Sequence, residues 1–210
     1  MDEIRIENFL YPYVRFVNAC PEVVGADFYH GNTLIAPNLG FGCFSRYGKM
    51  LAGTQEFIIT EAGNKNNVLA TLKLPFGKGE VYTVALVHSD GGAMAYGIME
   101  PTERSNLKYG HLRVCHLSPN LGSLDISING HDILGGIDYL EVSRYICVSP
   151  GTYEFRARNS TDGVLKLVMP NQEIREGKYN TLYIIGLSNE NPCLMGIFTV
   201  DAASYNGYYL

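Results

Sequence analysis

An arginine and an aspartate, twelve residues apart, occur together twice in this sequence, and they are the charges best placed to form a site. Arg15 precedes Asp27, and Arg113 precedes Asp125. One interpretation is a structural ion pair that bridges adjacent strands in each half. The other is a polar site that holds a ligand. We favour the structural interpretation, because Asp125 and Ser127 lie on the polar side of an alternating segment.

A histidine and an asparagine take equivalent places after these arginines. His116 follows Arg113, and Asn18 follows Arg15. A catalytic histidine needs a nucleophile or an acid within hydrogen-bond reach. Asparagine shares the hydrogen-bonding ability of histidine but not its acid–base chemistry. We therefore predict that both residues fix a turn.

Cys20 is followed by Pro21, and His30 lies further along, so a Cys–His nucleophile has to be considered. The second half has Ser118 in place of the cysteine, and no oxyanion loop or third partner is visible. The chain also lacks a CxxC motif, and its histidines show no i, i+2 or i, i+4 pairing. We therefore expect neither an enzyme nor a metal or other cofactor.

The sequence repeats itself at a step of 98 residues, which carries Arg15 onto Arg113. Further matches at or near this step are Asp27 with Asp125, Ser45-Arg46-Tyr47 with Ser143-Arg144-Tyr145, Gly79 with Gly177, and Gly97-Ile98 with Gly196-Ile197. A repeat of this length indicates a duplicated domain, since solenoid units are about 20–50 residues long. We expect a first domain over residues 1–101 and a second over 109–210, packed closely because the connector is short.

The secondary-structure signal has period two. In the segment 152–158, Tyr153, Phe155 and Ala157 fall on one face and polar residues on the other, which is typical of a half-buried strand. We expect seven strands in the first half, near 13–19, 26–30, 33–36, 44–50, 55–61, 67–74 and 81–87, and a further strand at 94–99. Asn129-Gly130 predicts a hairpin turn, and Pro150-Gly151 predicts a type II turn with positive φ at the glycine. The fold class is therefore all-β, with two tandem sandwiches.

The motifs also resemble a known family. They are Arg15 and Arg113, His116, Ser118-Pro119, Asp27 and Asp125, Gly31 and Gly130, and Pro150-Gly151-Thr152-Tyr153. They resemble the DUF4397 domain, a bacterial domain of unknown function that often occurs in tandem. Its usual pattern is an arginine in a strand, His-Ala-Ser-Pro, an aspartate in the next strand, and later Pro-Ala-Gly-Thr-Tyr.

The resemblance covers residues 11 to about 200, and the second half matches better. The first half departs from the pattern at Asn18, Cys20 and Gln55. The resemblance implies an immunoglobulin-like or transthyretin-like sandwich, commonly in exported or envelope-associated proteins. It implies no catalytic residues.

Composition narrows the range of partners. The net charge of −5 and the lack of any Lys/Arg cluster argue against nucleic acid. No apolar run approaches the roughly 18 residues of a membrane helix, so we expect no membrane insertion. The N-terminus lacks the pattern of a signal peptide, which predicts a cytoplasmic protein, whereas the family resemblance implies an envelope or coat. The repeat does not align the five cysteines, so we expect reduced, mostly buried thiols and no disulfide framework.

These observations favour a non-enzymatic binding or assembly module of a bacterium, with a protein partner or self-association. The alternative is a protein that binds a small ligand or a glycan in the crevice between the two domains. The C-terminal segment 204–210 contains Tyr205, Tyr208 and Tyr209. It either packs back on the second domain or contacts a neighbouring chain.

Overall fold

The computed structural model describes residues 11–102 and 108–205, which form two compact units of β-strands. Unit 1 comprises residues 11–102, and unit 2 comprises residues 108–204. Most of the expected connector (103–107) and most of the aromatic tail (206–210) lie outside the described residues. Within the described ranges, no helix has the length and apolar character needed to cross a membrane.

Each unit contains eight strands. Those of unit 1 are β1 (Tyr13–Asn18), β2 (Gly25–His30), β3 (Thr33–Gly40), β4 (Gly48–Lys49), β5 (Gly53–Glu61), β6 (Asn64–Phe76), β7 (Val81–Ser89) and β8 (Gly92–Glu100). Those of unit 2 are β9 (Gly110–His116), β10 (Leu124–Ile128), β11 (His131–Ile137), β12 (Ile146–Val148), β13 (Gly151–Asn159), β14 (Leu165–Ile174), β15 (Tyr179–Ile185) and β16 (Met195–Val200). A short 3-10 turn, η1 (Ala202–Tyr205), follows β16.

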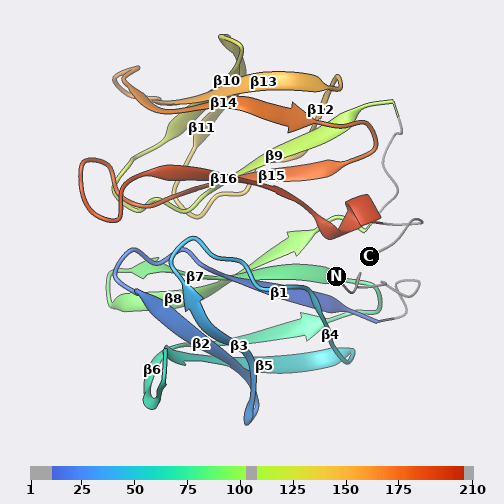
Figure 1. The fold of residues 1–210 in the computed structure, drawn as a ribbon, viewed down its shortest axis with the longest axis vertical. Coiled ribbons are helices and arrows are strands. Elements are labelled where there is room, and N and C mark those ends of the chain that lie inside the picture. The colour runs from blue at the N-terminus through green and yellow to red at the C-terminus, as the bar shows by residue number, and fades with distance from the viewer. Residues whose placement is uncertain (1–10, 103–107, 206–210) are drawn as a thin grey trace. The chain divides into compact units, whose positions relative to one another are not determined.

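The two units have the same topology (Figure 1). In unit 1 the sheets have the strand orders β4-β1-β7-β8 and β3-β2-β5-β6. In unit 2 they are β12-β9-β15-β16 and β11-β10-β13-β14, which is the same order strand for strand. The first strand of each unit pairs in parallel with the seventh, and the other pairings between strands are antiparallel. The duplication seen in the sequence is therefore a duplication of the whole sandwich.

Each unit has its own hydrophobic core between its two sheets. In unit 1 the ring of Phe16 on β1 lies 4.9 Å from that of Phe28 on β2 and 5.4 Å from that of Phe57 on β5. In unit 2 Phe155 occupies the place of Phe57, and its ring lies 5.3 Å from that of Phe198. Alternation along the strands sends these side chains inward, because successive residues of a strand face opposite sides of the sheet.

The structure confirms the all-β fold with two tandem sandwiches. The strand expected at 94–99 is β8, which completes the sheet β4-β1-β7-β8, so each sandwich has eight strands and not seven. Asn129 and Gly130 both have positive φ, 48° and 82°, as the predicted hairpin requires. The type II turn predicted at Pro150-Gly151 is wrong, because Gly151 does not have the positive φ that such a turn needs. All five cysteines are free thiols, but only Cys20 and Cys115 are buried, so the expectation of mostly buried thiols is wrong.

Candidate functional site

Arg15 lies on β1, where its neighbours Val14 and Phe16 face the core. It points to the other side of the sheet, yet it is buried, with 5% of its surface exposed. The parallel register places Thr83 of β7 beside it, and Arg15 Nε donates to Thr83 Oγ1 at 2.7 Å. Arg15 Nη2 lies 3.1 Å from Glu100 Oε1 on β8. One arginine therefore ties three neighbouring strands together.

The carboxylate of Glu100 is the centre of this network. It accepts hydrogen bonds from the hydroxyl of Thr83 and from Tyr47 Oη, the latter at 2.7 Å to Oε2. Tyr47 and Phe44 come from the segment between β3 and β4, and their rings lie 4.8 and 4.9 Å from Arg15 Cζ. Both aromatic faces stabilise the guanidinium as well as shielding it from water.

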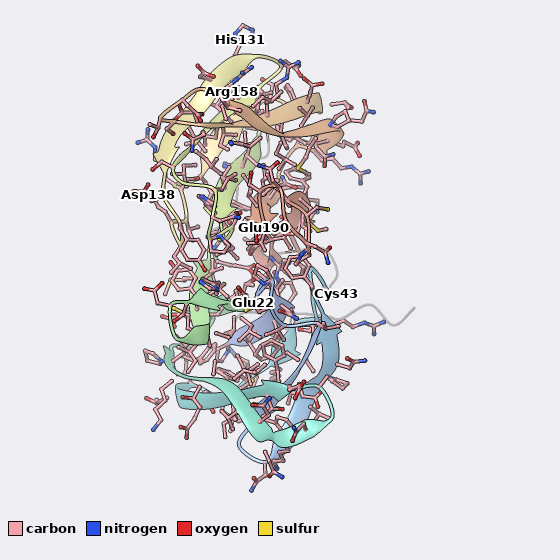
Figure 2. The ribbon with its side chains drawn as sticks, turned by 90° about the vertical axis from the view of Figure 1, so that its left-hand side faces the viewer. Glu22, Cys43, His131, Asp138, Arg158 and Glu190 are labelled. Atoms are coloured by element: carbon pink, nitrogen blue, oxygen red, sulfur yellow. The ribbon has the colours of Figure 1, made fainter. Side chains whose placement is uncertain are left out.

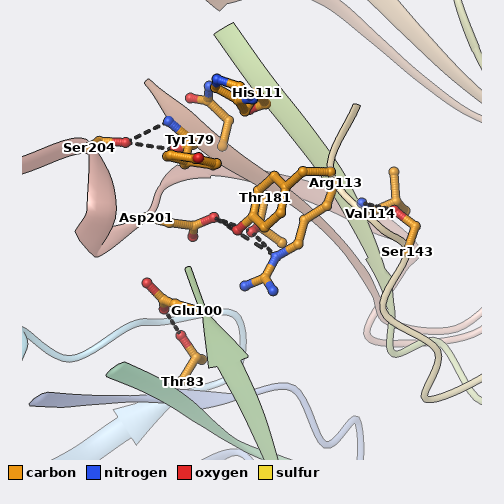
Figure 3. A network of polar contacts seen from close by, with 12 residues as sticks. Thr83, Glu100, His111, Arg113, Val114, Ser143, Tyr179, Thr181, Asp201 and Ser204 are labelled. Atoms are coloured by element: carbon orange, nitrogen blue, oxygen red, sulfur yellow. Dashed lines mark hydrogen bonds and ion pairs between the residues drawn. The ribbon is translucent and has the colours of Figure 1, made fainter. Parts of the chain in front are cut away.

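Unit 2 contains the same network. Arg113 Nε donates to Thr181 Oγ1 at 2.8 Å, and the hydroxyl of Thr181 donates to Asp201. Tyr145 Oη donates to Asp201 Oδ2 at 2.6 Å, and its ring lies 4.7 Å from Arg113 Cζ. Figure 3 shows Asp201 joined to Thr181 and Arg113, and it also shows the pair formed by Thr83 and Glu100 in unit 1. Two residue types change: the acid is the shorter aspartate, and Val142 stands where unit 1 has Phe44.

The two acids take equivalent places in the strand register, although the step of 98 does not align them. Gly97 lies opposite Val84, whereas Phe198 lies opposite Leu182, so the step is 101 in the last strand. Gly97 is therefore equivalent to Phe198, and the match of Gly97 with Gly196 in the sequence is wrong by two residues. The longer β15–β16 connection causes the shift, and for this reason the sequence did not reveal Glu100 and Asp201 as partners of the arginines.

The polar groups of this network already bond to one another, which leaves them little capacity to act on a substrate. Thr83 and Thr181 are each fully buried, and each hydroxyl accepts from an arginine and donates to an acid. Burial raises the pKa of Tyr145, and the neighbouring carboxylate of Asp201 raises it further, so this phenol stays protonated. Removing one partner would leave the other charge buried and uncompensated, which is strongly destabilising, so the network has a structural role.

The predicted pairs of Arg15 with Asp27 and of Arg113 with Asp125 are wrong. The strands β1 and β2 follow each other in sequence but belong to different sheets, and so do β9 and β10. Asp27 instead accepts from the backbone N–H of Asn38 at 2.7 Å and of Gly63 at 2.9 Å. The repeated aspartates thus hold loops in place and do not neutralise the arginines.

Asp125 holds the equivalent loops of unit 2. Its Oδ1 accepts from the backbone N–H of Gly136 at 2.9 Å and from Ser160 Oγ at 2.7 Å. The bond from Ser160 and then that from Gly136 lower the pKa of Asp125 below its ordinary value, so the carboxylate stays ionised.

His116 and Asn18 make matching contacts in the turn after the first strand of each unit. His116 Nε2 lies 2.8 Å from the carbonyl oxygen of Gly122, and its Nδ1 accepts from Ser118 N at 3.3 Å. Asn18 Nδ2 donates to the carbonyl of Val23 at 2.8 Å, and its Oδ1 accepts from the residue two positions later. One donor and one acceptor close the turn in each case, which is the role expected for both residues.

The pattern of one family, described as a domain of unknown function (DUF4397), matches residues 12–127 and 110–204. The chain belongs to the DUF4397 family. This confirms the resemblance seen in the motifs, and it covers both units. No curated protein matches the chain in sequence.

Three solved structures show a distant likeness to this DUF4397 chain. The first is a family-26 carbohydrate-binding module of Eubacterium rectale Amy13K, bound to maltoheptaose, at 13% identity and a TM-score of 0.29 over 91% of this chain and 98% of that one. A candidate cell adhesion protein of Bacteroides uniformis is 8% identical, with a TM-score of 0.31 over 91% and 98% of the chains. Another from Bacteroides fragilis is 12% identical, with a TM-score of 0.22 over 80% and 68%. With scores this low, the fold assignment rests on the strand pairing alone.

Cys20 of the DUF4397 chain is not placed as a nucleophile. It is fully buried, and burial, followed by the hydrogen bond to Glu22, raises the pKa of its thiol to about 12. His30 contacts Gln55, with 2.7 Å between Nε2 and Oε1, and does not activate the cysteine. In the part of the chain that the structure describes, no cluster of three His, Cys, Asp or Glu side chains could hold a metal ion.

Proposed function

We propose that this DUF4397 protein is a non-enzymatic module that binds a protein partner or a second copy of itself. The observation that supports the proposal is that the recurrent polar groups are used inside the units, in both copies. Arg15 and Arg113 neutralise buried acids, and Asp27 and Asp125 hold backbone N–H groups. Because these arginines and aspartates stabilise the fold, we assign the function to the exposed surface.

The exposed surface offers two features that suit contact with another protein. Several large apolar side chains lie at the surface, among them Val24 at 89%, Leu51 at 69% and Met99 at 54% exposure. Each sheet is also open, and its edge strands carry backbone groups that can pair with a strand of a partner. Both features support a protein partner over a small substrate.

The place of action we propose is the cell envelope or a coat of a bacterium. The support is the family alone, whose members are commonly exported or envelope-associated. Fractionation of the native host, with an antibody against the chain, tests this proposal. We expect the chain in the envelope or coat fraction, and recovery only with cytoplasmic markers would contradict it.

Binding is tested by sedimentation velocity over a range of concentrations, together with cross-linking and affinity capture in the native host. We expect either self-association or one partner that is recovered repeatedly. Truncation after residue 205 tests whether residues 206–210 contribute to binding. The truncated chain keeps Ser204, whose hydroxyl accepts from Tyr179 N at 2.7 Å and donates to Tyr179 O at 2.9 Å.

A glycan ligand is the competing function, and a thermal-shift panel of saccharides tests it in parallel. A ligand at about 100 times its Kd stabilises the native state by about 2.7 kcal/mol, which is readily seen. A strict monomer without partners, stabilised by one saccharide, would overturn the proposal in favour of glycan binding.

A further inference from the structure

Unit 1 has an open groove with a volume of about 440 Å³ beside the start of β2 and the turn from β5 to β6. Apolar side chains line part of it, namely those of Val23, Val24, Ala62 and Leu69. The other lining side chains include two carboxylates, from Glu22 and Glu61 (Figure 2 labels Glu22). We call this feature the Glu61 groove.

The repeat explains why the groove is open in unit 1. Asn159 of unit 2 stands where unit 1 has Glu61, and its Nδ2 donates to the carbonyl of Leu121 at 2.9 Å. A Cβ on Gly122 would lie 2.9 Å from this amide nitrogen, so the asparagine needs a glycine beneath it. Unit 1 has Val24 at that position, and an ionised glutamate cannot donate to a carbonyl. The Glu61 side chain therefore stays outside, and the space remains open.

The rim of the Glu61 groove offers hydrogen-bond acceptors with negative charge. Glu61 Oε2 accepts from Asn67 Nδ2 at 3.0 Å. Glu22 Oε1 lies 2.8 Å from His88 Nδ1, and its Oε2 accepts from the thiol of Cys20 at 3.1 Å. Burial raises the pKa of Glu22, but these donors outweigh it, and the pKa lies below its ordinary value. Both carboxylates thus keep acceptor sites for a further donor.

We propose that the Glu61 groove binds the side chain of a lysine on a partner protein. The ammonium group would lie at the carboxylates of Glu22 and Glu61, and the methylene chain would lie along the apolar wall. An ammonium suits two carboxylates on one rim, because its three donors can point to acceptors on different side chains, whereas a guanidinium fork matches the two oxygens of a single carboxylate. This inference rests on the proposed function, because it names the chemistry of the partner.

The direct test is NMR of the full-length chain with Nα-acetyl-lysine amide as the probe. We expect concentration-dependent shifts at the backbone amides of Val24, Ala62 and Leu69. The same compound acetylated on Nε, which is neutral, should cause none. Glu61→Gln should weaken binding at least ten-fold, whereas Glu56→Gln should not, because Glu56 lies on the sheet face beside Lys73 at 3.5 Å.

Three results would overturn this inference. They are equal binding of the neutral compound, equal binding to Glu61→Gln, and much tighter binding of free 1,5-diaminopentane, which would assign the groove to a small diamine. Other results distinguish a failure of the lysine site from a failure of the proposed function. If wild type and Glu61→Gln capture a partner equally well, the protein is a binding module, but the groove does not bind the partner's lysine. If no partner or self-association is found while the lysine probe still binds, the proposed function is contradicted, but the groove remains a binding site for an ammonium group.

Discussion

Asn18 and His116 show how two side chains of different chemistry meet one geometric need. Each gives a donor to a carbonyl and an acceptor to an N–H in the same turn. The neutral imidazole suits this arrangement, because a protonated ring would lose the acceptor that Ser118 N uses. Because Asn18 makes these contacts in the first half, we expect the second half to tolerate asparagine in place of His116.

We predict that His116→Asn removes a pH dependence of stability. Burial lowers the pKa of His116 from 6.5, against the opposing effects of the Gly122 carbonyl and of Asp138 and Glu141. The unfolded chain therefore takes up this proton at a higher pH than the folded chain. Stability from this group is present above the unfolded pKa and is lost as the pH falls from 6.5 towards the folded pKa.

Urea unfolding at about pH 7.5 and about pH 5, on either side of the ordinary histidine pKa, measures this effect. Wild type should lose more stability between the two conditions than His116→Asn. An equal loss in both proteins would show that folding does not lower the pKa of His116.

We predict that the thiols differ sharply in reactivity. Cys20 and Cys115 are fully buried, and burial is the largest cause that raises the pKa of each to about 12. The exposed thiols are Cys43, Cys147 and Cys193 (Figure 2 labels Cys43). Iodoacetamide should modify these three in the native protein and the buried two only after unfolding, as mass spectrometry of peptides will show. Labelling of Cys20 first would restore the nucleophile hypothesis.

At the scale of strands and sheets, much of the fold could be predicted from the sequence. Alternation placed the strands, and Asn129-Gly130 placed a hairpin, because both are local signals. The pairing of Arg15 with Asp27 failed for a reason that local signals cannot reveal. Consecutive strands of a sandwich can belong to different sheets, so nearness in sequence does not give nearness in space. The true partner, Glu100, lies 85 residues away, on a strand that reaches β1 only through β7.

We predict that Gly196→Ala destabilises unit 2. Gly196 lies on β16, and an added Cβ would collide with Met169 of β14 and press on Leu167. Met169 can move, so the cost is that of overpacking, about 1–3 kcal/mol. Chemical denaturation measures it. Gly91→Ala is the matched control, since no atom lies within 4 Å of a Cβ there and its φ is not positive, and an equal loss in both variants would refute the packing argument.

At the scale of the whole molecule, the chain has two separate hydrophobic cores with the same plan. Phe57 and Phe155 occupy equivalent places, and both are almost fully buried. We predict that either Phe→Ala substitution costs about 3–5 kcal/mol in its own unit. Hydrogen exchange should rise in the strands around the substituted core and remain low in the other unit. Equal deprotection of both units by one substitution would show that they unfold as one.

We conclude that the repeated arginines are structural, and equilibrium denaturation of Arg113→Met is the decisive experiment. Removing this charge leaves the carboxylate of Asp201 buried without its cation, which should lower the free energy of unfolding by about 3–5 kcal/mol. Lys73→Met is the control, because its ion pair with Glu56 is exposed and should be worth at most about 1 kcal/mol. A loss in Arg113→Met well beyond the control is the predicted result. An Arg113→Met protein as stable as wild type would contradict the account and return the arginines to the list of functional candidates.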